Sequence, residues 1–195
     1  SGLLVDKLGG PGVNPYQPSV LFGRNAIGAS NVSFAQSKGE GLYRRSLYTY
    51  WKRQIPAANM RILGSDGRNS CRTRRERTNT PLQALVLLND PQFVEAARSL
   101  AERCFREGGE SAEERLGYAF RLATSRRVAP AELKVLLTEY RERLAEFRNN
   151  PAAANSYISG GGERPADAGI NPVELAAYAA VVSLILNLDE SISKS

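Results

Sequence analysis

The segment from Asn171 to Glu190 constrains the fold more than any other part of the sequence. It reads NPVELAAYAAVVSLILNLDE and carries no charge between Glu174 and Asp189. Asn171 is a suitable N-cap, and Pro172 suits the first helical position. A helix that is apolar on every side must be enclosed on every side. We therefore predict a central helix surrounded by other helices.

Four earlier segments combine a helix start signal with apolar residues at helical spacing. The starts are Thr80–Pro81, Asp90–Pro91, Ser111 and Pro130. The expected buried stripes are Leu82, Leu85 and Val86; Phe93, Ala97, Leu100, Ala101 and Cys104; Leu116, Phe120 and Ala123; and Leu133, Leu136, Leu137, Tyr140, Leu144 and Phe147. No segment alternates long enough to indicate a sheet. The predicted class is all-α: an irregular bundle of five or six helices with a long irregular N-terminal arm.

The first 42 residues form the predicted arm, because they hold eight glycines and three prolines and show neither helical nor strand period. We expect residues 1–42 to pack on the rest of the chain or on a missing upstream part, and residues 43–195 to form the helical domain. The opening SGLL resembles the tail of a helix that begins further upstream. For the aromatic and basic segment from Tyr43 to Pro56 we favour a short helix over a strand.

Basic residues are concentrated between Tyr43 and Arg77, where ten Lys/Arg face two acids, a net charge of +8 against +6 for the whole chain. Such a cluster can bind an anionic partner, because guanidinium groups pair with carboxylates and phosphates. It can equally be internal structure, which the capped helix directly after it favours. The candidate anion-binding residues are Arg72, Arg74, Arg75, Arg77, Arg44, Arg45 and Lys52.

Histidine is absent, which excludes Ser-His-Asp and Cys-His nucleophile systems and histidine-ligated metal or haem within this chain. Cys71 and Cys104 are too few for a metal cluster and could form one disulfide or stay two thiols. We predict no catalytic residues, no metal and no cofactor in this chain. The longest apolar run, Ala176–Leu186, is well short of the roughly 20 residues that span a bilayer. No signal peptide opens the chain, so we expect a mature or excised piece or a cytosolic protein.

Several long motifs in this order resemble one family, the planctomycete-type domain of unknown function number fifteen fifty-three. They are GGPGVNPYQP, RRSLYTYWKR, RRERTNTPLQALVLLNDPQFVEAAR, GYAFRLATSRRVAPAEL and ELAAYAAVVSLILNLDE. The chain resembles the C-terminal part of that domain. The resemblance implies a large exported protein, periplasmic or extracellular, that often carries a c-type cytochrome module. Haem would then belong to other parts of the full-length protein, since this chain has no haem motif.

The resemblance also bears on the partners and on the cysteines. An oxidising compartment is where Cys71 and Cys104 could pair. Acidic polysaccharide or a protein neighbour becomes a better partner than nucleic acid. The favoured function is a non-catalytic helical module that packs against companion domains. The alternatives are half of an enzyme completed by absent upstream residues, or an anion-binding surface through the arginine segment. We also expect the missing upstream portion, or a second copy of the chain, to cover part of the core.

Overall fold

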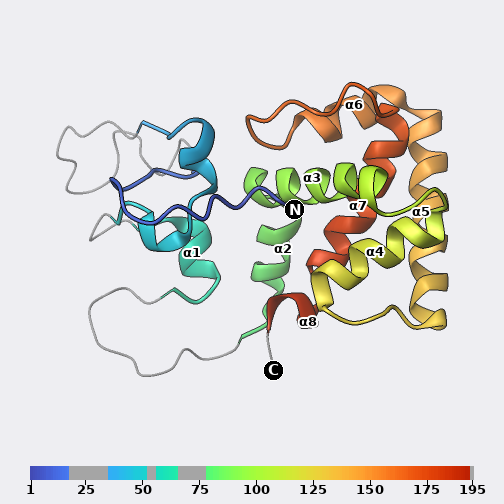
Figure 1. The fold of residues 1–195 in the computed structure, drawn as a ribbon, viewed down its shortest axis with the longest axis horizontal. Coiled ribbons are helices and arrows are strands. Elements are labelled where there is room, and N and C mark those ends of the chain that lie inside the picture. Colours follow the sequence, from blue (N-terminus) through green and yellow to red (C-terminus); the bar gives the residue numbers. More distant parts are fainter. Residues whose placement is uncertain (18–34, 52–55, 66–77, 194–195) are drawn as a thin grey trace. The chain divides into compact units, whose positions relative to one another are not determined.

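The structure is a computed structural model that describes residues 1–17, 35–51, 56–65 and 78–193 (Figure 1). The chain forms two compact units. One comprises Leu3–Thr78, and the other comprises Asn79–Ser195 together with Ser1 and Gly2. The border between the two units lies after residue 78. The predicted division into an arm of residues 1–42 and a helical domain of residues 43–195 stays a prediction.

The Leu3–Thr78 unit joins the N-terminal arm to the aromatic and basic segment. Its elements are the 3-10 turns η2 (Gly39–Tyr43) and η3 (Ser46–Tyr48) and the helix α1 (Ala58–Ile62). Parallel bridges pair Val5 with Arg44 and Val13 with Thr49. The short helix favoured for residues 43–56 is wrong in its described part. The chain bonds there to the arm: the Val13 N–H donates to the carbonyl of Tyr48 at the end of η3, and the N–H of Tyr50, just after η3, donates to the Val13 carbonyl, both at 2.8 Å.

The Asn79–Ser195 unit is helical, which confirms the predicted class. Its helices are α2 (Pro81–Asn89), α3 (Pro91–Glu107), α4 (Ala112–Thr124), α5 (Pro130–Asn149), α6 (Pro151–Ser159), α7 (Pro172–Leu186) and the short α8 (Asp189–Ile192). Six of them have nine or more residues, in agreement with the expected five or six. Within the described residues the structure contains isolated bridges but no extended strand.

Helix starts follow the capping residues that the sequence indicates. The Thr80 hydroxyl accepts from the Gln83 N–H at 3.3 Å, and the Gln83 side chain accepts from the Thr80 N–H at 2.9 Å. Asp90 accepts from the N–H of Gln92 at 2.9 Å. Each of these bonds satisfies a backbone donor that the first turn of a helix leaves unpaired.

Thr80→Ala is expected to lower the free energy of unfolding by about 1 kcal/mol, because it removes the acceptor at the start of α2. Urea unfolding followed by circular dichroism measures this change. Thr138→Ala is the matched control, since Thr138 is an exposed threonine within α5 whose hydroxyl bonds to the Lys134 carbonyl. We expect the control to change stability by about 0.5 kcal/mol or less. Equal effects of both substitutions would contradict the capping role.

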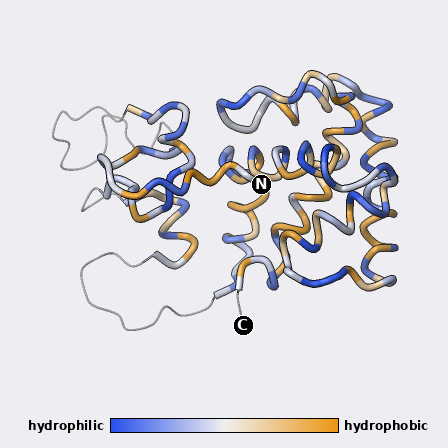
Figure 2. Tube along the Cα trace, viewed as in Figure 1, coloured by the Kyte–Doolittle hydropathy of each residue, from blue (hydrophilic) through white to orange (hydrophobic). Residues whose placement is uncertain are grey.

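The apolar helix α7 is the centre of the Asn79–Ser195 unit, the second of the two, as predicted. It packs against α3, α5, α6, α4 and α2, and nine of its 15 residues are buried. Figure 2 shows hydrophobic residues along most of its length. Leu184 of α7 nevertheless stays 41% exposed. The expected cover of part of the core by a missing upstream portion or by a second copy of the chain stays a prediction.

The predicted stripes of α3, α4 and α5 join the same core, with Leu100, Leu116 and Phe120 at most 2% exposed. The predicted buried face of α2 is wrong: Leu82 is 54% and Leu85 56% exposed, whereas Gln83 is buried. Residues 84–88 of α2 are all apolar, so helical spacing does not single out one of its faces.

Candidate functional site

Two of the predicted anion-binding residues, Arg44 and Arg45, bond to the N-terminal arm within the Leu3–Thr78 unit, the first of the two. Arg44 donates to the carbonyl oxygens of Lys7 at 2.8 Å and Gly9 at 2.6 Å, and its guanidinium lies 4.0 Å from the centre of the Tyr48 ring. Arg45 forms an ion pair of 2.8 Å with Asp6, and this hydrogen bond lowers the pKa of the Asp6 carboxyl. Both arginines therefore have internal partners, as expected for structural residues.

The remaining predicted site residues lie outside the described residues, so their roles stay predictions. They are Arg72, Arg74, Arg75, Arg77, Lys52 and Cys71. The other cysteine, Cys104, has no exposed surface, and this burial raises the pKa of its thiol to about 11. A thiol with such a pKa is protonated at neutral pH and reacts poorly.

A cluster of buried charges on α3, the α3 charge cluster, consists of Glu95, Arg98 and Glu102. Their side chains are at most 3% exposed. Arg98 lies 3.7 Å from the Glu95 carboxylate and 3.8 Å from that of Glu102. It also donates to the backbone carbonyls of Ile158 and Arg164. The helix is thus bonded to the loop that follows α6.

That loop, residues 160–169, approaches α3 closely enough to need glycine. A Cβ at Gly162, where φ is +68°, would overlap the Glu95 carboxylate. Glu95 accepts from the Arg164 N–H at 2.8 Å, and Glu102 accepts from the Asp167 N–H at 3.2 Å. Sequence reasoning missed this cluster, because charges three and four residues apart usually mark a solvated helix face. The signal that could have found it is the run of glycines in SGGGERPADAG.

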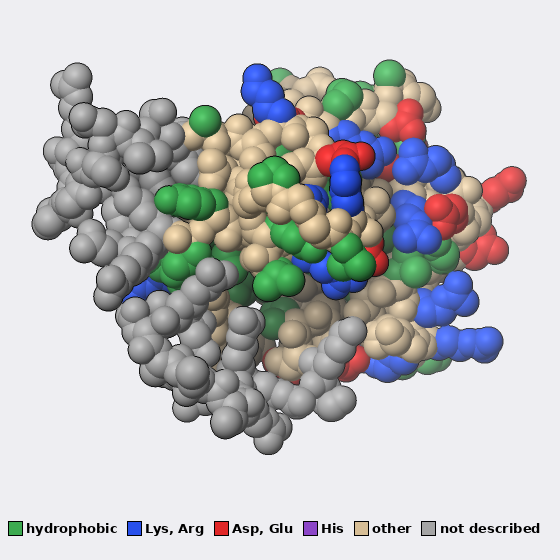
Figure 3. Space-filling view, turned by 60° about the vertical axis from the view of Figure 1, so that its left-hand side comes forward, with side chains coloured by type: hydrophobic (Ala, Val, Ile, Leu, Met, Phe, Trp, Pro, Cys, Tyr) green, Lys and Arg blue, Asp and Glu red, His purple; other side chains and the backbone are tan. Residues whose placement is uncertain are grey.

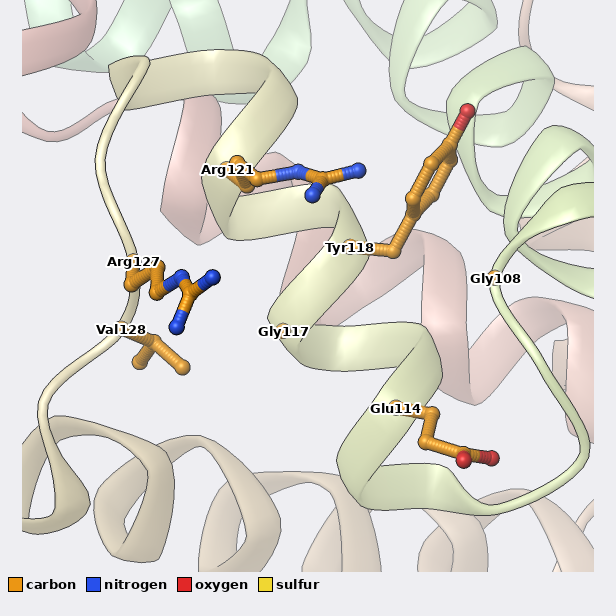
Figure 4. Close-up of a pocket in the computed structure, with 7 residues that line it drawn as sticks. All are labelled: Gly108, Glu114, Gly117, Tyr118, Arg121, Arg127 and Val128. Atoms are coloured by element: carbon orange, nitrogen blue, oxygen red, sulfur yellow. The ribbon is translucent and has the colours of Figure 1, made fainter.

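A hollow of about 520 Å³, here the arginine hollow, lies between α4 and the turn that leads into α5 (Figure 4). Its lining residues are Gly108, Glu114, Gly117, Tyr118, Arg121, Arg127 and Val128. Figure 4 shows Arg127 pointing from the turn toward α4, and Arg121 extending from α4 toward Tyr118. Gly117 presents no side chain there, and Val128 Cγ1 lies 3.7 Å from the position that a Cβ at Gly117 would take.

Neighbouring charges of the hollow are engaged in ion pairs. Arg126 donates to Glu132 at 2.6 and 2.8 Å and to Glu190 at 2.7 and 2.9 Å. The bonds from Arg126 to Glu132 lower the pKa of the Glu132 carboxyl to about 2. The Tyr118 hydroxyl donates to Glu107, which also pairs with Arg103 at 2.8 Å. Within the described residues, by contrast, Arg121 and Arg127 form no ion pair.

A second hollow of about 510 Å³ lies among α2, α5, α6 and α7, and Leu88 and Leu184 both line it. Its arginine, Arg143, is neutralised by Glu139 at 2.7 Å and Glu146 at 2.9 Å. This second hollow therefore offers mainly apolar side chains and few unpaired charges.

Leucines of α2, of the C-terminal end of α7 and of the residue that precedes α8 form what we call the leucine face: Leu82, Leu85, Leu88, Leu184 and Leu188. Except for the half-buried Leu88, these leucines are 39–56% exposed. Two contacts hold their helices together: Asn79 donates to Asp189 at 3.0 Å, and Asn187 to the Ala84 carbonyl at 3.5 Å. In the view of Figure 3, hydrophobic side chains lie in separate groups over the visible surface, and acidic and basic side chains are intermixed toward its right-hand side.

The described residues contain neither a cluster of metal-ligating side chains nor a helix able to cross a membrane. No three acidic, cysteine or histidine side chains gather there as metal ligands would. None of the described helices has the length and apolar character that crossing a membrane requires.

These features define a class: a helical module with a buried charge cluster, a basic hollow and an exposed leucine face. Residues 1–140 match the family PSD1, whose description is "Protein of unknown function (DUF1553)". The chain belongs to this family. The match ends within α5, so the closing motif of α7 lies beyond the matched residues. No curated protein and no solved structure matches the chain.

Proposed function

We propose that the chain is a non-catalytic helical module of a larger exported protein, and that it packs against a companion domain through the leucine face. The observation that carries the proposal is the exposure of Leu85 on α2 and Leu184 on α7, at 56% and 41%, on two helices that contribute Leu88 and Leu184 to the second hollow. Contiguous exposed apolar surface is typical of protein contacts, because its burial is favourable by roughly 25 cal/mol per Å².

The choice of a companion domain as the occupant rests on the family. The resemblance to the domain of unknown function fifteen fifty-three implies large, multi-domain, exported proteins. In such a protein a second domain is tethered to this one, and tethering raises its effective concentration at the leucine face to the millimolar range with short linkers. A face of moderate size is then sufficient for a stable contact.

Photo-crosslinking in cells of the source organism tests this function. Leu85 or Leu184 is replaced by benzoylphenylalanine in the native polypeptide, and crosslinked peptides are identified by mass spectrometry. We expect crosslinks from both positions to peptides of the same polypeptide that lie outside these 195 residues. The same spectra show whether the polypeptide carries covalently bound haem, as a cytochrome-linked protein would.

The control position is Val135 on α5, which is 68% exposed but does not belong to the leucine face. We expect few crosslinks from it. Crosslinks between identical peptides would instead indicate a second copy of the chain as the occupant. If positions 85, 184 and 135 crosslinked equally, or only within the chain, the leucine face would not be a domain contact. Recovery of the polypeptide in the cytosolic fraction would contradict export.

A further inference from the structure

The arginine hollow contains two arginines that form no ion pair with the described residues, a feature that packing against a companion domain does not explain. Most arginines of the Asn79–Ser195 unit have a partner within that unit: Arg98, Arg103, Arg106, Arg126, Arg143 and Arg164 form ion pairs, and Arg115 donates to the Gly109 carbonyl. Arg121 and Arg127 differ, because both line one hollow and neither pairs with a carboxylate of the described residues. The nearest aromatic group to Arg121 is the ring of Tyr118, 5.8 Å away.

Two guanidinium groups at one hollow provide the donors that an oxyanion needs. A guanidinium presents its N–H groups in a fixed fork that matches a carboxylate, and such charge-assisted bonds are about twice as strong as neutral ones. The second hollow lacks this property, since Arg143 already binds two glutamates. The arginine hollow is therefore the better anion site of the two.

The opposite side of the arginine hollow carries an acceptor. Glu114 Oε2 accepts from the N–H groups of Glu110 at 3.1 Å and Ser111 at 3.0 Å, and these bonds lower the pKa of the Glu114 carboxyl. The carboxylate is therefore ionised and fixed in place. Its other oxygen, Oε1, makes no hydrogen bond to the described residues, so it can accept a hydroxyl from a ligand.

We propose that the arginine hollow binds a carboxylate that carries hydroxyl groups, with the carboxylate at Arg121 and Arg127 and a hydroxyl at Glu114. A bare anion such as sulfate satisfies the arginines but is repelled by Glu114. A neutral sugar satisfies Glu114 alone. The volume of about 520 Å³ lies within the range of small-ligand sites and accommodates a sugar acid. The source is either a free sugar acid or a uronate residue of a polysaccharide.

Site-resolved titration of the full chain tests the proposal, because other basic segments of the chain also attract anions. The probe is glucuronate, and the readout is the amide resonance of Gly117, which lies in the middle of the hollow (Figure 4). We expect saturable shifts of Gly117 with glucuronate. Sulfate, acetate and glucose should each bind at least about tenfold more weakly, because sulfate and acetate lack a hydroxyl group and glucose lacks an anionic group. If any of the three binds as well as glucuronate, the proposal is wrong.

Variants separate the two ends of the hollow. Arg121→Gln and Arg127→Gln should each weaken glucuronate binding about tenfold or more. Arg148→Gln is the matched control, since Arg148 is exposed on α5 away from the hollow, and it should leave binding unchanged. Glu114→Gln should bring the affinities for glucuronate and acetate closer together, because it removes the charged hydroxyl acceptor. An unchanged ratio in that variant, or unchanged binding in both arginine variants, overturns the assignment.

The length of the ligand distinguishes its source. If a trimer of galacturonate shifts the Gly117 amide resonance at a much lower concentration than monomeric galacturonate does, the source is a polysaccharide. If the two shift it at equal concentrations, the source is a free sugar acid. Both outcomes support a hydroxylated carboxylate as the ligand. The result is independent of the domain contact, because the residues of the arginine hollow do not belong to the leucine face.

Discussion

Replacing Arg98 with methionine is expected to lower the free energy of unfolding by about 3–5 kcal/mol, the cost of leaving buried charges without their partner. Glu95 and Glu102 are at most 1% exposed and would lose the guanidinium between them. The carbonyls of Ile158 and Arg164 would lose their donor as well. Urea unfolding followed by circular dichroism at 222 nm measures the change, since most of the described helix lies in the Asn79–Ser195 unit.

Arg103→Met is the matched control on the same helix. Arg103 also pairs with a glutamate four residues later, but its side chain is 34% exposed. Exposed pairs contribute about 1 kcal/mol or less, so we expect a small change. A loss of stability at Arg98 no larger than that at Arg103 would show that the α3 charge cluster is not what fastens the loop after α6.

Phe120→Ala is expected to cost about 3–5 kcal/mol, because it leaves a cavity where α4 meets the core. Phe120 is 2% exposed and belongs to the same apolar cluster as α7. The Arg126 guanidinium lies 4.6 Å from the centre of the Phe120 ring. The substitution therefore also removes the ring against which Arg126 packs while it binds Glu132 and Glu190. The same unfolding experiment measures the effect.

Leu122→Ala is the control for this cavity, since Leu122 lies two residues further along α4 and is 39% exposed. We expect a loss of about 1 kcal/mol or less there, in proportion to the smaller area that Leu122 buries. If the two substitutions cost the same, Phe120 would not be a core residue.

The helices of the second unit were predictable because their signals are local. Thr80, Asp90 and Ser111 accept hydrogen bonds from the first turn of the helix that follows, and residues within a few positions supply both partners. The stripes of α3, α4 and α5 were predictable for a similar reason, since one face of each helix is apolar. The absence of charge along α7 placed it at the centre.

Other features depend on which elements meet, and the sequence does not state this directly. The exposed face of α2 could not be predicted, because apolar residues surround that helix and neighbouring helices decide which ones are buried. Glu95 and Glu102 are buried by a loop that comes more than 60 residues later. The segment around Arg44 became extended because the distant arm offered hydrogen bonds.

The arginine hollow was missed for a related reason. The predicted anion site was the densest cluster of arginines in the sequence, from Arg72 to Arg77, which lies outside the described residues. Arg121 and Arg127 are only two of the charges that the sequence places around the turn SRRVAP. What distinguishes Arg121 and Arg127 is that Arg126, which lies between them in the sequence, forms ion pairs with the nearby Glu132 and Glu190. Pairing of this kind is a property of the folded structure.

The place of α7 along the chain has a consequence for synthesis. The ribosome makes α2 to α6 first, and each of them has an apolar face that packs on α7 or on a helix that does. Until residues 172–186 have left the exit tunnel, these faces have no common partner and stay accessible to solvent or to chaperones. The unit is then completed in one late step that joins distant parts of the chain, and contacts of this kind slow folding. A stop codon or a stalled ribosome shortly before α7 would therefore yield a chain with exposed apolar helix faces that is prone to aggregation, rather than a smaller folded protein.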